Sequence, residues 1–184
     1  ATMSIAQEDF ASARDYAQQS LDLCRERELE TGPLIPAAQH CLAIVHLVEK
    51  NYDDAEKLWL VVLERQQQNG ERSLTARTLN YLGAAAQLQG DHKTAESYYR
   101  DALATQENDS TIYPVMRFVS LWRLARIRYR QGDETESREL LNRAISIAEA
   151  TRVGTYGAEQ QRADFFAQFA PAFDAAFHLS LREG

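Results

Sequence analysis

The sequence predicts an all-α solenoid, that is, a stack of antiparallel helix hairpins. Composition is one reason: Ala, Leu, Glu, Gln and Arg dominate, the chain has only 8 Gly and 4 Pro, and strand-like alternation is absent. The second reason is that small residues recur at spacings of 42, 40 and 42 residues. These residues are Ala13, Ala55, Ala95 and Ser137. A period in this range is typical of one supersecondary unit stacked on copies of itself.

A third observation is a Leu followed by a small residue, which precedes three of these positions. The pairs are Leu42-Ala43, Leu82-Gly83 and Leu124-Ala125. The small residue of each unit lets two helices approach closely, and a larger residue four positions later fills the seam. The larger residues are Trp59, Tyr99 and Leu141, and Val62, Ala102 and Ala144 follow three positions after them. One hairpin cannot bury such a stripe alone, so neighbouring hairpins are required.

The helices can be predicted in chain order. The first 12 residues are polar and are expected to be the tail of a helix-turn-helix. A helix is predicted over 7–29, with Phe10, Ala13, Ala17 and Leu21 at helical spacing. Thr31-Gly32-Pro33 ends it. Three hairpins follow, with helices at 35–49 and 52–69, at 71–89 and 92–107, and at 112–131 and 134–152.

Three short segments are expected to reverse the chain within these hairpins. They are Lys50-Asn51-Tyr52, Gly90-Asp91 and Gly132-Asp133. Glycine is suited to this position because it adopts the left-handed backbone conformation at little cost.

We therefore expect a single solenoid domain over residues 1–184. Its repeats are a partial one at about 1–31 and full ones at 33–70, 71–110 and 111–152, with a capping helix or helix pair at 153–184. The first unit lacks a partner helix, which suggests a fragment of a larger protein.

Charge and cysteine content exclude several classes of function. The net charge of −7 argues against binding to nucleic acid or to an anionic membrane, since either requires excess Lys and Arg. No apolar run reaches the ~20 residues of a membrane span, and no signal peptide is found. Cys24 and Cys41 are expected to be free, half-buried thiols in a reducing cytosol, which predicts a cytoplasmic protein.

We find no candidate enzyme chemistry. The four histidines share no metal-ligand spacing with cysteines or carboxylates, so no metal is expected. The sequence has no phosphate-binding glycine loop and no nucleophile motif, so neither a cofactor nor catalysis is expected.

Residues 79–103, LNYLGAAAQLQGDHKTAESYYRDAL, resemble a tetratricopeptide (TPR) repeat. The segments LWRLARIRYRQGDETESRELLNRAI and LAIVHLVEKNYDDAEKLWLVVL follow the same pattern, and the resemblance covers roughly residues 5–150. The period exceeds the usual length of roughly 34 residues. This resembles the long-repeat TPRs of kinesin light chains, bacterial STAND regulators and caspase-like CHAT proteins. The resemblance implies a right-handed superhelix that binds a peptide or a partner domain on its concave face.

The tail narrows the resemblance. Residues 152–184 are similar to the segment that often closes the TPR array ahead of a CHAT protease domain, with Arg162, Phe165, Phe166, Phe169 and Phe173 at the matching positions. This implies the regulatory region of a CHAT-type protease, with an adjoining domain of the same chain as one partner. The alternative is the inducer-sensing TPR region of a STAND-type transcription regulator.

Phenylalanines recur every four residues in this tail. They are Phe165, Phe169, Phe173 and Phe177. The stripe either packs the last helices onto the fourth repeat or forms a docking surface. Pro171 predicts a kink near Ala170.

The resemblance also implies which residues face a ligand, because the first helix of each TPR pair lines the concave face. The third unit contributes Arg77, Asn80, Ala84, Gln87 and Leu88; the fourth contributes Val119, Trp122, Arg126, Tyr129 and Arg130; the second contributes the more apolar His40, Ile44, Leu47 and Val48.

The fourth set is unusually basic. Five arginines and no acid lie between Met116 and Gln131, and Arg126 and Arg130 share one helix face with Trp122 and Tyr129. Guanidinium groups beside aromatic rings suit a carboxylate or an acidic peptide. The alternative is that these arginines pair with acids of neighbouring helices, such as Glu134, Glu136 or Glu139. We therefore expect a non-enzymatic protein-interaction scaffold with a protein or peptide partner.

Overall fold

The structure is a computed structural model that describes residues 2–27, 34–106, 114–154 and 170. The described residues form helices and no strand. The helices are α1 (Thr2–Glu26), α2 (Leu34–Val48), α3 (Tyr52–Gln68), α4 (Arg72–Gln89), α5 (His92–Gln106), α6 (Pro114–Arg130) and α7 (Glu134–Gly154). The predicted all-α solenoid is confirmed.

The predicted bounds of α2 to α7 agree with the structure to within two residues. The first helix differs, because α1 begins at Thr2 and not near residue 7. The expected helix-turn-helix tail over residues 1–12 is therefore wrong. The helix continues through this stretch because it contains no Gly or Pro to end a helix.

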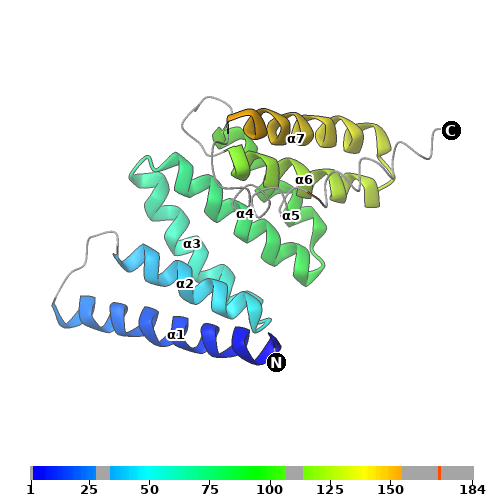
Figure 1. Cartoon of the computed structure of the whole chain (residues 1–184). Helices are drawn as coiled ribbons and strands as arrows, with labels where there is room; N and C mark the ends of the chain where they lie inside the picture. Colours follow the sequence, from blue (N-terminus) through cyan, green and yellow to red (C-terminus); the bar gives the residue numbers. More distant parts are fainter. Residues whose placement is uncertain (1, 28–33, 107–113, 155–169, 171–184) are drawn as a thin grey trace.

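The helices stack in chain order. Each packs against the helix before it and the helix after it, and α4 also contacts α6. Figure 1 shows the succession from α1 at one end to α7 at the other. The first helices of neighbouring hairpins are thus close enough to share side-chain contacts.

The turns inside the hairpins have the expected backbone. Gly90 and Gly132 have φ values of 87° and 84°. The aspartate after each glycine caps the next helix: Asp91 Oδ1 accepts from the Thr94 amide and Asp133 Oδ1 from the Glu136 amide, both at 3.0 Å. Lys50 takes the left-handed position of the earlier hairpin, with φ 65°. A Gly-Asp pair therefore ends one helix and begins the next.

The predicted seams are buried. Ala55, Ala95 and Ser137 are almost fully inaccessible, as are Trp59 and Tyr99. The helices approach closely at Gly83, where an added Cβ would lie 2.6 Å from Cε1 of Tyr99. Glycine is required there because the ring fills the space that any side chain would need.

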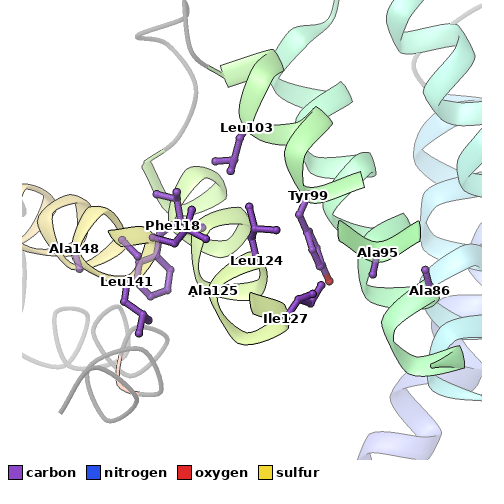
Figure 2. Packing of buried hydrophobic residues seen from close by; sticks show 13 residues of the cluster. Ala86, Ala95, Tyr99, Leu103, Phe118, Leu124, Ala125, Ile127, Leu141 and Ala148 are labelled. Atoms are coloured by element: carbon purple, nitrogen blue, oxygen red, sulfur yellow. The ribbon is translucent and has the colours of Figure 1, made fainter. Parts of the chain in front are cut away.

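The core is a continuous strip and not a single centre. One buried cluster runs from α4 through α5 and α6 to α7, a second joins α2 and α3 to α4 and α5, and a third joins α1 to α2. Figure 2 shows the ring of Tyr99 beside Leu124 and Ile127 of α6. Every hairpin is thus stabilised by burial against its neighbour.

The two cysteines differ in exposure, and the residues of the tail lie outside the described part of the chain. Cys24 is buried and Cys41 is exposed, and both are free thiols. The tail motif lies outside the described residues, and so do the four stripe phenylalanines and Pro171.

Candidate ligand-binding sites

The residues predicted to line a groove fall into different environments. Asn80 is buried: its Nδ2 donates to the carbonyls of Ala76 at 3.1 Å and Met116 at 3.4 Å, and its Oδ1 accepts from Ser120 Oγ at 2.9 Å. These bonds hold α4 against α6. Asn80 is therefore a packing residue in this structure and not part of an open surface.

Gln87 lies half-buried near the arginines of α6. Its Oε1 accepts a hydrogen bond from the Tyr99 hydroxyl at 3.3 Å. Burial raises the pKa of Tyr99, and the nearby Arg123 and Arg126 act in the opposite direction. The Gln87 amide and the Tyr99 hydroxyl are thus joined close to Arg123 and Arg126 of α6.

The predicted cluster on α6 is present. The guanidinium of Arg126 lies 5.5 Å from the ring centroid of Trp122, within the range of a cation–π contact. Burial, followed by the charges of Arg130 and Arg123, lowers the pKa of Arg126. Three like charges therefore converge beside an aromatic ring.

The three arginines of this cluster have no acidic partner among the described residues. Within the part of the chain that the structure describes, no ion pair joins Arg123, Arg126 or Arg130 to a carboxylate. Like charges without counter-charges repel one another, so the cluster favours a bound anion.

The alternative hypothesis, pairing with acids, holds for a different arginine. Arg128 contacts Glu96 of α5 and Glu136 of α7, with its Nε 2.8 Å from Glu136 Oε2. Arg100 joins the same group at 3.3 Å from Glu136. Arg128 therefore links three helices, while its neighbours in the sequence remain available.

Arg77 lies in a third environment, a cavity of about 790 Å³ between α2, α3 and α4. His40 lines it too, and its Nδ1 accepts from the indole Nε1 of Trp59 at 3.1 Å. Burial and then the charge of Arg77 lower the pKa of His40 to about 4. The ring of Tyr81 meets that of His40 edge-on at 4.9 Å and stacks on Trp59 at 5.1 Å.

Sequence reasoning missed this cavity. It placed His40 in an apolar stretch and assigned Trp59 to the seam alone. The 19-residue separation of His40 and Trp59 carries no motif, and only the packing of α2 on α3 brings them together.

No group of three His, Cys, Asp or Glu side chains among the described residues could hold a metal ion. A search of the same residues finds no helix with the length and apolarity to cross a membrane.

Stacked helix hairpins with polar and aromatic surfaces define an α-solenoid repeat protein. Tetratricopeptide repeat models match residues 34–108 and 119–151, which together make up more than half of the chain. The chain belongs to the tetratricopeptide repeat family. Such repeats typically serve as protein–protein interaction scaffolds.

Two solved structures share the fold. BtubC (BKLC) from P. vanneervenii matches with a TM-score of 0.71 and 20% identity over 82% of this chain. The chain spans only 61% of that protein. Nearly identical TPR-like repeats assigned to a Podosopora anserina kinesin light chain match with a TM-score of 0.57 and 20% identity, over 96% of this chain and 92% of that one. Among curated proteins, no sequence matches significantly.

Proposed function

We propose that this chain is a non-enzymatic interaction scaffold that binds an acidic peptide segment of a partner protein on α6. The observation that carries the proposal is the Arg126–Trp122 pair with Arg123 and Arg130 beside it and no acid paired to them in the described residues. A carboxylate would relieve the repulsion between the guanidinium groups, and the ring would contact the aliphatic part of the peptide.

Binding of acidic peptides tests this proposal. Peptides rich in Glu, each with a Gln-substituted control, are titrated by fluorescence anisotropy. The double variant Arg126→Glu and Arg130→Glu should weaken binding of the acidic peptides by at least about tenfold.

A matched control is Arg143→Gln, on an exposed part of α7. This variant should bind like the unchanged protein. Equal affinity of the double variant and the unchanged protein would contradict the proposal, and so would equal binding of the Gln peptides.

A second part of the proposal concerns the kind of larger protein to which these repeats belong. The resemblance of Arg162, Phe165 and Phe166 to the segment ahead of a CHAT protease domain supports a regulatory role in such a protease. The alternative is an inducer-sensing region of a STAND-type regulator. The residues encoded on either side decide between them: a His/Cys protease domain downstream supports the first, and a nucleotide-binding domain upstream supports the second.

A further inference from the structure

The cavity between α2, α3 and α4 is separate from the arginine cluster on α6. It is formed by the beginning of α2, the end of α3 and the beginning of α4, and its volume is about 790 Å³. Sites for small ligands usually measure roughly 300–1,000 Å³. The cavity is therefore large enough for a small molecule or a few residues of a peptide.

One wall carries an unsatisfied cation. Arg77 is half-buried, and its buried Nε has no hydrogen-bond partner in the part of the chain that the structure describes. No ion pair among the described residues includes Arg77. A buried donor without an acceptor is unfavourable, so an anionic acceptor bound here would stabilise the site.

A second donor lies beside it. Because Nδ1 of His40 accepts from Trp59, the proton of the neutral imidazole is on Nε2. The low pKa of His40, about 4, keeps the ring neutral at pH 7. Arg77 and His40 together offer the donors that a planar carboxylate accepts.

Part of the cavity lining is apolar. Val61 and Leu74 are 53% and 37% exposed, and Ile35 lines the same space. Aliphatic groups that face water gain free energy when a ligand covers them. This favours a ligand with an aliphatic part.

The remaining charges limit the charge of the ligand. Arg65 and two carboxylates also line the cavity, so its lining charges balance. The carboxylates are engaged with amides: Glu71 accepts from Asn69 at 3.1 Å, and Glu64 accepts from Gln68 at 3.4 Å. They would repel a phosphate or another polyanion more than a single carboxylate.

We propose that this cavity binds a monocarboxylic acid, with its carboxylate on Arg77 and His40 and its aliphatic part against Val61 and Leu74. The carboxylate can belong to a free organic acid or to a Glu side chain of a peptide flanked by apolar residues. The proposal does not depend on the proposed function of α6.

The two tryptophans of the chain give a test that separates the two sites. Trp59 reports on the cavity through its bond to His40, and Trp122 reports on the α6 cluster. The probes are hexanoate and the peptide Ac-Leu-Glu-Leu-NH2, with hexanamide and Ac-Leu-Gln-Leu-NH2 as uncharged controls. The indole N–H resonances of the two residues are followed by NMR.

Hexanoate or the acidic peptide should shift the Trp59 resonance, whether or not the Trp122 resonance also moves, while the amides and inorganic phosphate should have little effect on Trp59. Binding of hexanoate alone identifies a free acid as the source, and binding of the peptide identifies a protein segment. Arg77→Gln should weaken binding at least about tenfold. Arg126→Gln should leave it unchanged.

Val61→Asp is a second variant, at a position where the side chain is exposed. Its added charge should repel the carboxylate and weaken binding. The proposal is overturned if neither acid shifts Trp59 at millimolar concentration, if the amides bind equally well, or if folded Arg77→Gln and Val61→Asp both keep full affinity. A shift of the Trp122 resonance alone would support binding at the α6 cluster and would overturn the proposal for the cavity.

Discussion

The junction between α4 and α6 is closed, whereas the corresponding junction between α2 and α4 contains a cavity. In the closed junction, Asn80 hydrogen-bonds across to Ser120 and to the carbonyl of Met116. In the open junction the equivalent position, 40 residues before Asn80, is His40. The ring of His40 contacts that of Tyr81, and His40 also lines the cavity. Equivalent positions of the two junctions therefore carry different side chains: Asn80 bonds across the closed junction, and His40 lines the cavity of the open one.

Two buried glutamines show a second consequence. Gln66 and Gln106 are also 40 residues apart. Thr78 donates to Gln66 Oε1 at 2.9 Å, but neither amide atom of Gln106 has a partner among the described residues. In the closed junction the hydroxyl to compare with that of Thr78 belongs to Ser120, and it is hydrogen-bonded to Asn80. In the closed junction Ser120 is therefore bonded to Asn80, and no described residue is a partner of the Gln106 amide.

The largest expected effect breaks the closed junction. Asn80→Ala removes the bonds to Ser120 and Met116 and leaves a cavity, so the free energy of unfolding should fall by about 2–3 kcal/mol. Urea unfolding measures this. Ser120→Ala should cost only about 1 kcal/mol, because Asn80 keeps its bond to Met116. Equal costs would contradict the assignment of Asn80 as the main link.

The next largest effect is a loss of stability at low pH, caused by protonation of His40 in the open junction. The pKa of His40 in the folded protein is about 4, below its ordinary value of 6.5, because of burial and then the charge of Arg77. The unfolded chain therefore binds the proton first, and stability present above pH 6.5 is lost as the pH falls towards 4. With allowance for partial exposure, the loss is about 2 kcal/mol.

His40→Asn is the matched variant for this measurement, since Asn can still accept from the Trp59 indole but does not titrate. Unfolding of both proteins is measured between pH 7 and pH 4. The carboxylates act alike in both, so the difference in stability should change by the predicted amount. A difference that is independent of pH would show that His40 titrates normally.

Replacing the two buried glutamines by leucine should change the stability of the protein in opposite directions. Gln66→Leu should destabilise the protein by about 1–2 kcal/mol, because Thr78 then lacks its acceptor. Gln106→Leu should instead stabilise it by about 1 kcal/mol, because it removes a buried amide without partners in the described residues. Thermal unfolding of the two variants measures both effects. The same sign for both would contradict the difference between the junctions.

The smallest effect concerns the turns. Lys50 has the left-handed backbone that Gly90 and Gly132 adopt in the later hairpins. Lys50→Gly should therefore stabilise the protein by about 0.5–1 kcal/mol, and Gly90→Ala should destabilise it by a similar amount. Chemical unfolding of both variants tests this, and a destabilised Lys50→Gly would contradict it.

The hairpins were predictable because their signals are local. Gly90 and Asp91 end one helix and cap the next, and the alternation of small and large residues at Ala95 and Tyr99 follows from helix packing. The first helix was predicted too short, since its polar N-terminal residues resemble a loop in composition alone. The α6 cluster was predicted from charge, because Arg126 and Trp122 lie four residues apart.

The sequence by itself determined the helices, their order, the turns and the buried seam, since these depend on residues within about 20 positions of each other. Only the tertiary structure decided which polar side chains stabilise the stack and which remain available. Asn80 and Arg128 are engaged by other helices, whereas Arg77 and Arg126 form no ion pair within the described residues. The physical reason is that such pairings join side chains of different helices, as Asn80 with Ser120 and Arg128 with Glu96, and their geometry is set by how successive hairpins stack.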